Sequence, residues 1–339
     1  MGQPLEISAR AKPASYIAEL EGWRGVAIAF LMLGHYGGAL FFPFGRLGVE
    51  FFFVLSGRLM AHLLFVNKVG LRDFYVRRIS RVFPALWLFV FAMLAMTYVF
   101  GKFDVTLHDA FHALTFTVNY TARPTVFEHI WSLCIEEHSY VALSLIALWS
   151  RRRPINVVAL LAVLAIAGIL NGVFQTWYLG HDYFSVYWRT DVRASSILIS
   201  AAIYLHLRSN NTQIDPLLCA VAIMSGITLE LLRVPDPIKY SLGTLLLAIG
   251  VAGAEKLPDI VKAVLTSRVV TMFGLWSFSI YLWQQPGALK DHHVPLFLLA
   301  AIVAGVTSFY LVEQPARRWI NARISRGAPA PELEVSTAT

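Results

Sequence analysis

The sequence of 339 residues is poor in charge and in cysteine. Only 14% of its residues are charged, against about 25% in ordinary soluble domains, which excludes a water-soluble protein of this size. The two cysteines, Cys134 and Cys219, both lie in apolar runs, so we expect free buried thiols and no disulfide framework. No small-residue cleavage site follows the first apolar run, and we therefore expect no cleavable signal peptide.

Several motifs of soluble enzymes are also missing. The sequence contains no phosphate-binding glycine loop, no GxSxG elbow and no HExxH zinc motif. His108 and His112 have the spacing of a helical metal pair, but no third ligand accompanies them, and we expect no metal cofactor. The net charge of +7 is interpreted as a signal of membrane topology and not of a nucleic-acid partner.

What the sequence does contain is long hydrophobic runs. Hydrophobic residues make up 57% of the chain, and its mean hydropathy is +0.60. Runs of about 17 to 25 apolar residues, the length that crosses a bilayer as a helix, recur along it. The sequence therefore predicts an all-α fold, a polytopic transmembrane helical bundle of about ten spans. The predicted spans are residues 23–43, 48–67, 82–100, 127–149, 155–171, 192–207, 215–233, 239–254, 268–286 and 294–313.

Positive charge alternates between the connections of these spans. Lys and Arg gather in every second connection, namely at residues 68–81, 151–153, 208, 256–262 and 317–326. The positive-inside rule places these segments, together with the N- and C-termini, in the cytoplasm. The long connections 101–126 and 172–190, rich in aromatic, His and Asp residues, are then outside.

The same signals divide the chain into three parts. Residues 1–22 form a cytoplasmic N-terminal segment, residues 23–320 a membrane domain, and residues 321–339 a cytoplasmic tail. The tail ends in small and polar residues, which predict disorder.

An arginine and a histidine share the first predicted span. His35 follows Arg24 by eleven residues, about three helical turns, so both side chains are expected on one helical face about 16 Å apart. This spacing places Arg24 at the cytoplasmic mouth and His35 near the membrane midplane. Neutral imidazole is a common general base, so His35 is the predicted catalytic residue. The alternative is a histidine that only hydrogen-bonds a neighbouring helix.

Three further charged residues are predicted at a similar depth. Arg58 lies in the second span, and the adjacent Glu136 and Glu137 lie in the fourth. Because a charge inside the membrane needs a partner, one carboxylate could orient His35 and the other could pair with Arg58, and the sequence does not decide which. The alternative for Arg58 is an ion pair that only locks two helices together.

A cluster of basic residues precedes the third predicted span. Arg81 is three residues from Arg78 and four from Arg77, so a helix would gather their guanidinium groups on one face. Such groups bind phosphate in a bidentate way, which makes the cluster a candidate site for a phosphate-bearing ligand. The alternative is a purely topological role, since the positive-inside rule alone places basic residues here.

These residues together describe a buried histidine reached from a basic cytoplasmic mouth. That arrangement suits the transfer of a group across the membrane from a phosphorylated donor to an acceptor. A competing hypothesis is a transporter or flippase of an anionic glycolipid, with the same residues as a proton relay. The density of buried ionisable groups argues against a membrane sensor or scaffold.

At this level the sequence resembles acyltransferase family 3, the integral-membrane O-acyltransferases that modify cell-surface glycans and some lipids or small metabolites. The first helix, the second-helix signature and the arginine motif of that family are similar to WRGVAIAFLMLGHY, FFFVLSGRLM and FYVRRISRVFPALW. The later blocks of the family are similar, in the same order, to IWSLCIEEHSYV, YWRTDVRASSIL, SFSIYLWQQP and FYLVEQP.

The resemblance implies a reaction and roles for individual residues. An acyl group, expected to be acetyl, would move from cytoplasmic acyl-CoA to a hydroxyl of a cell-surface carbohydrate such as an exopolysaccharide or O-antigen, at the bacterial inner membrane. His35, oriented by Glu136 or Glu137, would take the hydroxyl proton or carry the acyl group itself. The residues expected to meet the phosphates of coenzyme A are Arg24, Arg77, Arg78 and Arg81. The candidates for stabilising the oxyanion are Arg58, Trp131 and Tyr140.

The sequence also departs from the family pattern. Arg58 stands where an aromatic or aliphatic residue is usual, and His138 and Ser139 replace the usual Gln and Phe. Gln284 stands where many members have a histidine, so a second intramembrane histidine at that position cannot be essential here.

Overall fold

The computed structural model describes residues 18–121, 125–288 and 294–325. Within these residues the chain is built of helices and contains no strand, as predicted. In this described part of the chain, four helices are long and apolar enough to cross a membrane, and a fifth span results if two helices bent by 52° count as one. The protein is therefore an all-α, multi-pass membrane protein, whereas the number of about ten spans and the cytoplasmic placement of both termini stay predictions.

Each of the predicted spans is helical over most of its length. In chain order the helices are α1 (Ala18–Tyr36), α2 (Phe42–Ala61), α3 (Leu71–Phe100), α4 (Leu107–Leu114), α5 (Trp131–Arg152), α6 (Val157–Val173), α7 (Tyr183–Tyr187), α8 (Thr190–Ser209), α9 (Pro216–Leu231), α10 (Asp236–Ile238), α11 (Thr244–Ala252), α12 (Asp259–Leu265), α13 (Arg268–Trp283), α14 (Gln285–Ala288), α15 (Val294–Ser308) and α16 (Gln314–Ser325). Single π-helical turns extend or join helices at residues 62–66, 174–178, 239–243 and 309–313. Most of the predicted N-terminal segment and the predicted disordered tail lie outside the described residues.

The basic segment 68–81 is a helix from Leu71 onward and not a connecting loop. It forms the first turns of α3, which runs on without a break and contains Pro84 in its interior. Phe74 is buried on the protein while Arg77 is exposed, so these turns are amphipathic. The alternation of basic connections predicts which side of the membrane a segment occupies, but it does not predict whether that segment is helical.

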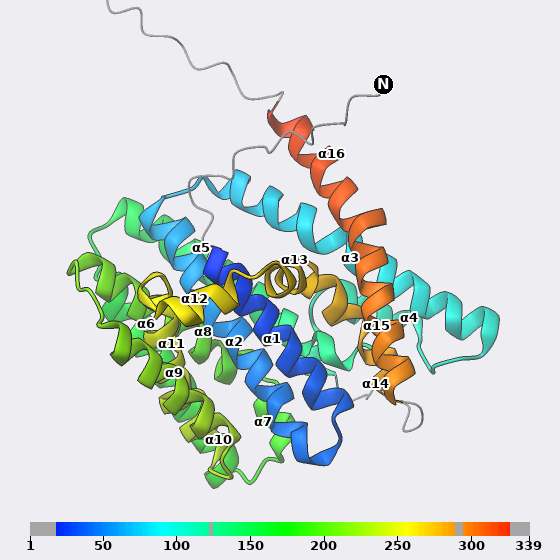
Figure 1. Ribbon diagram of the computed structural model, residues 1–339, viewed down its shortest axis with the longest axis horizontal. Helices are drawn as coiled ribbons and strands as arrows, with labels where there is room; N and C mark the ends of the chain where they lie inside the picture. Colours follow the sequence, from blue (N-terminus) through cyan, green and yellow to red (C-terminus); the bar gives the residue numbers. More distant parts are fainter. Residues whose placement is uncertain (1–17, 122–124, 289–293, 326–339) are drawn as a thin grey trace, which may run out of the picture.

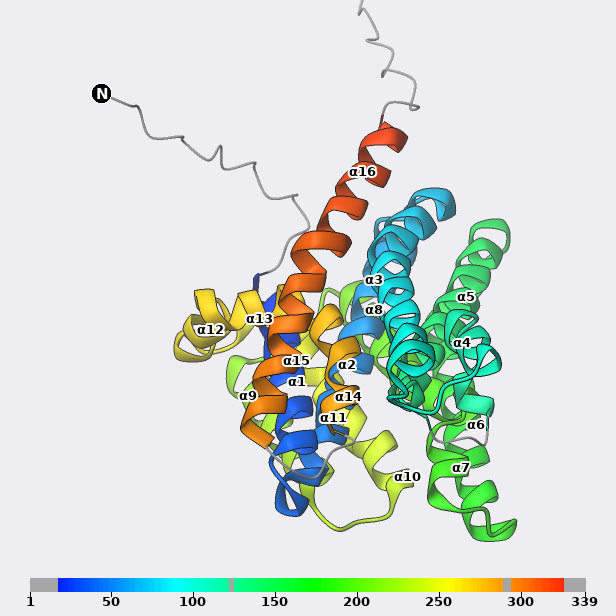
Figure 2. The ribbon, with the colours of Figure 1, turned by 90° about the vertical axis from the view of Figure 1, so that its right-hand side faces the viewer.

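Helix α1 is packed between two partners. It contacts α2 along one side and α13 along the other, and α2 in turn packs against α8. Figure 1 shows α1 and α2 in blue beside α13, and Figure 2 shows α16 at one end of the molecule with α7 and α10 at the other. The close approach of α1 and α2 requires glycine, because a Cβ at Gly34 would lie 2.1 Å from the backbone nitrogen of Gly45.

A buried ion pair joins α2 to α8. The Arg193 guanidinium donates to the Glu50 carboxylate, and their side chains are each 1% exposed. Thr244 of α11 donates to the same carboxylate. A charge buried away from water is stable only with such partners, so this cluster fixes three helices against one another.

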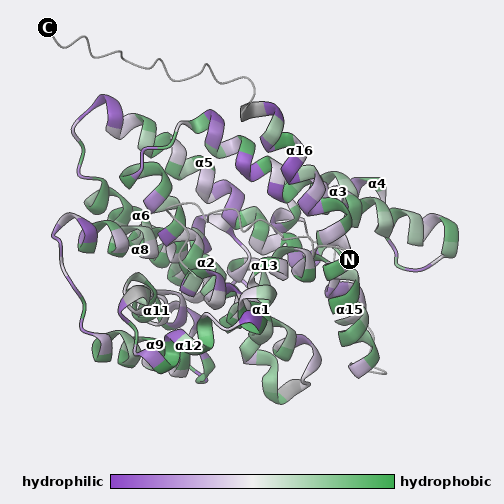
Figure 3. Ribbon diagram, turned by 45° about the horizontal axis from the view of Figure 1, so that its top comes forward, coloured by the Kyte–Doolittle hydropathy of each residue, from purple (hydrophilic) through white to green (hydrophobic). Residues whose placement is uncertain are grey.

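The outer surface of the bundle is largely hydrophobic. The helix formed by α6 and its π-helical extension is strongly apolar. Only 17% of its most apolar 18-residue stretch is buried inside the protein. Figure 3 shows hydrophobic residues along peripheral helices such as α15 and hydrophilic residues over α16 and the neighbouring part of α3. An apolar exterior of this kind is what a lipid environment requires.

Candidate active site

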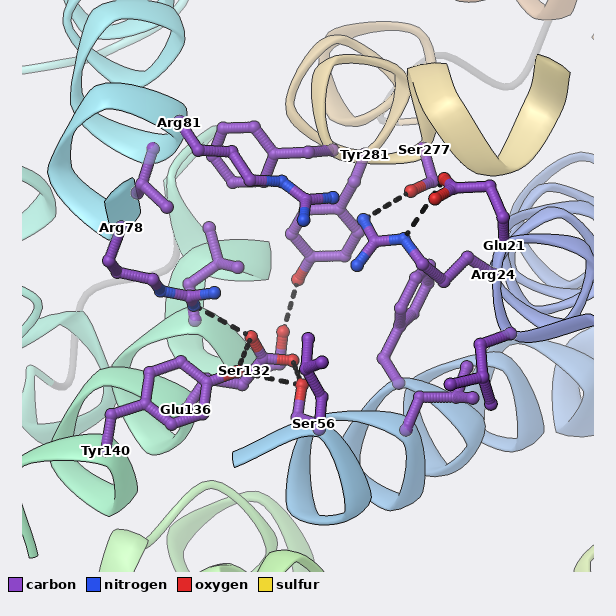
Figure 4. Close-up of a pocket in the computed structure, with 17 residues that line it drawn as sticks. Glu21, Arg24, Ser56, Arg78, Arg81, Ser132, Glu136, Tyr140, Ser277 and Tyr281 are labelled. Atoms are coloured by element: carbon purple, nitrogen blue, oxygen red, sulfur yellow. Dashed lines mark hydrogen bonds and ion pairs between the residues drawn. The ribbon is translucent and has the colours of Figure 1, made fainter. Parts of the chain in front are cut away.

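Two cavities lie next to α1, one around arginines and one around His35. The first, which we call the arginine cavity, has a volume of about 180 Å³. Its polar lining residues are Glu21, Arg24, Ser56, Arg78, Arg81, Ser132, Glu136, Tyr140, Ser277 and Tyr281. They come from α1, α2, α3, α5 and α13, and Figure 4 shows them converging on one space.

Arg78 is held by two carboxylates and an aromatic ring. Its Nε donates to Glu137 Oε1 at 2.7 Å and its terminal nitrogen donates to Glu136 Oε2 at 3.2 Å. The guanidinium carbon lies 4.1 Å from the centroid of the Tyr140 ring, a cation–π geometry. Glu136 also accepts from Tyr140 Oη at 2.9 Å and from Ser56 Oγ at 3.1 Å. The positive charge of Arg78 is therefore already neutralised within the protein.

Arg24 and Arg81 are less fully compensated. Arg24 donates to Ser277 Oγ at 2.8 Å, and its Nε lies 3.7 Å from Glu21 Oε1. Arg81 makes no hydrogen bond or ion pair with any residue that the structure describes, and its guanidinium projects into the cavity beside that of Arg24. Two guanidinium groups facing one carboxylate leave a net positive charge, which an anionic ligand can satisfy.

The second cavity, which we call the histidine cavity, has a volume of about 160 Å³. Its polar and aromatic lining residues are His35, Phe42, Arg46, Glu128, His129, Trp131, Tyr183, Phe184, Tyr187, Trp188, Tyr281 and Gln285. Trp131 and Trp188 are stacked, with an interplanar angle of 14°. The cavity therefore combines an aromatic wall with two histidines, one carboxylate and one guanidinium.

The short helix α7 supplies part of this aromatic wall. Asp182 caps α7 and accepts from the Ser185 backbone nitrogen at 3.1 Å. The hydrogen bond from the Ser185 side chain holds the pKa of the Asp182 carboxyl below its usual value, so it stays charged at neutral pH. Tyr183 and Tyr187 then lie with their ring centroids 5.0 and 4.7 Å from the guanidinium carbon of Arg46, and Arg46 also pairs with Asp236.

His35 has a defined hydrogen-bond partner. Its Nδ1 lies 2.5 Å from Gln284 Oε1, and an amide oxygen can only accept, so Nδ1 carries the proton. The Gln284 amide nitrogen faces Gln285 Oε1 at 3.3 Å, which fixes the same amide orientation. The lone pair of His35 is therefore on Nε2, which lies 3.8 Å from the position of a Cβ at Gly45. A methyl group at Gly45 would narrow the space in front of that nitrogen.

One face of α13 serves both cavities. Ser277, Tyr281 and Gln284 follow one another at intervals of four and three residues, the spacing of a single helical face. Ser277 accepts from Arg24, and Gln284 accepts from His35. Arg24 and His35 thus face the same neighbouring helix, as the expectation of a shared helical face requires.

The structure distributes the predicted site residues over different places. The arginine cavity is lined by Arg24, Arg78, Arg81, Glu136 and Tyr140. The histidine cavity is lined by His35 and Trp131. Neither cavity has Arg58, Arg77 or Glu137 among the described residues that line it.

Two predicted pairings are wrong. Glu136 and Glu137 both accept from Arg78 and neither bonds His35, which is oriented by an amide and not by a carboxylate. Arg58 is buried with its guanidinium carbon 5.5 Å from the Tyr204 ring centroid, and neither carboxylate forms an ion pair with it. Arg77, expected on the phosphate-binding face, is exposed on α3.

Sequence reasoning missed other residues of the site. Tyr281 and Gln284 stand in a quoted block, but neither was assigned a contact. Arg46, Glu128 and His129 were not singled out although they line the histidine cavity. One pattern could have identified part of the site. Ser277, Tyr281 and Gln284 are polar residues at helical spacing on an otherwise apolar helix, which predicts that this face contacts other polar groups.

No group of three potential metal ligands occurs among the residues that the structure describes. The His108 and His112 rings bond each other at 3.2 Å, and His112 Nδ1 bonds Thr117 Oγ1 at 2.7 Å. This pair lies on α4, away from both cavities.

The fold and the two cavities define an integral-membrane protein with an arginine cluster and a positioned histidine, and comparison with known families identifies its class. The chain belongs to acyltransferase family 3, whose acyltransferase domain matches residues 17–321. No solved structure matches the chain.

Curated relatives are O-acetyltransferases by name. YrhL of Bacillus subtilis (strain 168), whose name refers to a peptidoglycan O-acetyltransferase, is 27% identical over 356 residues, covering 89% of this chain and 55% of YrhL. The O-acetyltransferase OatA of Staphylococcus aureus (strain NCTC 8325 / PS 47) is 24% identical over 350 residues, covering 89% of this chain and 57% of OatA. The chain thus spans little more than half the length of these relatives.

Proposed function

We propose that this protein is a membrane O-acyltransferase that moves an acyl group, specifically acetyl, from cytoplasmic acyl-CoA to a hydroxyl of a cell-surface carbohydrate. The observation that carries the proposal is His35, held by Gln284 with a free lone pair in one cavity, while the incompletely compensated guanidinium groups of Arg24 and Arg81 line the next. Membership of the family and the names of the relatives support the same chemistry.

The arginine cavity is the proposed donor site. Arg24 and Arg81 are available for the phosphates of the 3′,5′-ADP end of coenzyme A, since each could make charge-assisted hydrogen bonds to phosphate oxygens. Arg78 is bound by Glu136 and Glu137, and we assign it a structural role in shaping this cavity. Arg77 is exposed and is left out of the donor site.

His35 is the proposed general base. Its Nε2 accepts the proton of the acceptor hydroxyl while the hydroxyl oxygen attacks the thioester carbonyl carbon. The carbon–sulfur bond breaks, the ester bond forms, and the proton passes from His35 to the departing thiolate, which leaves as the free thiol of coenzyme A. Attack by Nε2 itself would give an acyl-histidine relay instead, and the same tautomer serves that route.

Trp131 is the proposed donor to the oxyanion of the tetrahedral intermediate. Its indole can only donate a hydrogen bond, and it lines the same cavity as His35. Tyr140 lies in the arginine cavity with its hydroxyl bound to Ser56 and Glu136. Arg58 lines neither cavity among the described residues, so both are weaker candidates.

The histidine cavity is the proposed acceptor site. Its stacked and tilted aromatic rings, Trp131, Trp188 and Tyr187, combine apolar faces with polar edges. A sugar ring has the complementary pattern of apolar C–H faces and peripheral hydroxyls. Residues 183–188, from the predicted outer segment 172–190, form part of this wall. An acceptor would therefore arrive from outside a bacterial inner membrane while the donor arrives from the cytoplasm.

A transporter or flippase of an anionic glycolipid is not favoured. A transporter would be expected to resemble other transport proteins, whereas the curated relatives of this chain are named as O-acetyltransferases.

The proposal is tested with the purified protein in liposomes, acetyl-CoA and cell-wall glycan fragments. We expect acceptor-dependent release of coenzyme A thiol and alkali-labile acetyl groups on the glycan by mass spectrometry. Movement of a glycolipid across the liposome membrane without thiol release would refute the enzyme and support the transporter.

A further inference from the structure

Tyr281 is the one described residue that lines both cavities. Its side chain is buried, with 6% of its surface exposed. Figure 4 shows its ring at the edge of the arginine cavity, between Arg24 and Ser132. The histidine cavity begins on the other side of the same residue, where His129 and Gln285 line the wall.

The hydroxyl of Tyr281 is fixed from two directions. It donates to the backbone carbonyl of His129, which can only accept. The remaining bond, to Ser132 Oγ at 2.7 Å, must therefore run from the serine hydroxyl to the tyrosine oxygen. The ring also lies 5.3 Å from the His129 ring, centroid to centroid. His129 lies directly before α5 and Ser132 lies in its first turn. Helix α13, which carries Tyr281, and the start of α5 therefore hold the ring in place together.

This position has a consequence that rests on the proposed function. Arg24 and Arg81 face one cavity and His35 faces the other, so a thioester bound by its distant phosphates must reach His35 past the Tyr281 ring. The acyl group leads, because it lies beyond the sulfur. A ring anchored at both its backbone and its hydroxyl cannot move aside without losing two hydrogen bonds.

We infer that Tyr281 is a specificity-determining residue that restricts the donor to short acyl groups, acetyl above all. Each additional methylene must find room between the fixed ring and the wall of the histidine cavity, where Leu31 and Val49 contribute apolar side chains. Close-packed interiors tolerate added volume poorly. A single methylene in a tight apolar site is discriminated by about 10- to 200-fold.

The experiment compares kcat/KM for acetyl-, propionyl- and butyryl-CoA in four proteins: wild type, Tyr281→Phe, Tyr281→Ala and the control Tyr98→Ala. Tyr98 is exposed on α3 and lines neither cavity. We expect wild type to prefer acetyl over butyryl by at least about 10-fold, the lower bound for one methylene. Tyr281→Phe keeps the ring but loses both hydrogen bonds of the hydroxyl, so its preference should lie between those of wild type and Tyr281→Ala, whereas Tyr98→Ala keeps both preference and rate. Tyr281→Ala should bring the butyryl rate to within about 3-fold of the acetyl rate.

The ratio of butyryl to acetyl use separates the possible outcomes. A wild-type protein that transfers no acyl group refutes the proposed function. An active wild type that uses both donors equally, or a Tyr281→Ala variant with the wild-type ratio, refutes the inference alone. If Tyr281→Ala binds donor but does not turn over, affinities for the thioether analogues of acetyl- and butyryl-CoA, measured by calorimetry, decide. If it does not accumulate, Ser132→Ala, which removes one of the two hydrogen bonds that hold the ring, is measured in the same way; an unchanged ratio there also refutes the inference.

Discussion

Glu136 and His35 line different cavities, on opposite sides of Tyr281. The carboxylate belongs to an ion pair with Arg78, whereas the imidazole bonds the neutral amide of Gln284. An amide sets the tautomer of a histidine without placing a negative charge beside it. Glu136 therefore compensates the charge of Arg78, whereas His35 and Gln284 are available for proton transfer. Mutations of the two pairs should have different effects on stability and on catalysis.

The first prediction concerns His35 itself. His35→Gln keeps hydrogen-bonding capacity but cannot accept a proton at neutral pH, so we expect acyl transfer to fall by about 10²- to 10⁴-fold. His35→Ala should be at least as inactive. The rate is measured as acceptor-dependent release of coenzyme A. Both variants should still bind acyl-CoA, because the arginine cavity is untouched. If His35→Gln transfers acyl groups at a near wild-type rate, His35 has only a packing role.

The second prediction concerns the amide that orients the histidine. Gln284→Leu leaves the Nδ1 proton of His35 without an acceptor, which costs about 1–3 kcal/mol if the tautomer is retained. We expect kcat to fall by about 10- to 100-fold, in line with that range, with little change in KM for acyl-CoA. Gln213→Leu, at an exposed position between α8 and α9, is the matched control. An unchanged kcat in Gln284→Leu would show that the tautomer is set by something else.

The third prediction uses two arginines of the same helix. Arg81 faces the arginine cavity, and Arg77 is exposed one turn earlier on α3. A hydrogen bond to a charged group contributes about 1.5–3 kcal/mol, so Arg81→Gln should raise KM for acyl-CoA by about 10- to 150-fold. Arg77→Gln should leave it within about 2-fold. Arg81→Lys should rescue in part, since an ammonium lacks the planar fork. Equal effects at both positions would point to topology alone.

The fourth prediction concerns stability. Removing Arg78 leaves the carboxylates of Glu136 and Glu137 without the guanidinium group that they bind. Breaking one partner of a buried ion pair typically destabilises by about 3–5 kcal/mol. Arg78→Gln should therefore lower the thermal unfolding temperature and the protein level in the membrane. Adding Glu137→Gln should restore part of the loss. A stable Arg78→Gln protein whose only defect is weak acyl-CoA binding would instead make Arg78 a donor ligand.

The fifth prediction concerns topology. Segments 68–81 and 151–153 should be cytoplasmic and segments 101–126 and 172–190 outside. Single cysteines are placed in each segment of a protein that lacks Cys134 and Cys219, which are both buried. A membrane-impermeant thiol reagent should label only the second pair in intact cells. Labelling at 151–153 from outside would reverse the direction of transfer.

Periodicity along one helix was a reliable guide. The eleven-residue spacing of Arg24 and His35 predicts a shared face, and both residues do contact the α13 side of α1. A regular helix converts spacing into direction, so this inference needs no knowledge of the neighbours. The arginine motif followed the prediction in part, since Arg78 and Arg81 both line the cavity while Arg77 is exposed.

Contacts between distant helices were not predictable in the same way. Gln284 lies 249 residues from His35 along the chain, and nothing in either local pattern says which of the other helices packs opposite. Glu136 and Glu137 were expected at the depth of His35, but α3 places Arg78 nearer to both. Depth and direction restrict the partners of a buried charge, whereas the order in which helices pack selects among them.

The ion pair between Glu50 and Arg193 also affects how the protein inserts into the membrane during its synthesis. The two residues are 143 positions apart, and translation proceeds at about 5–20 residues per second. About 7 to 30 s therefore pass between synthesis of the carboxylate and synthesis of its guanidinium partner. A lone charge in lipid is unfavourable by at least about 2.5 kcal/mol. During that interval α2 is an unfinished membrane segment, and its secure insertion waits for α8.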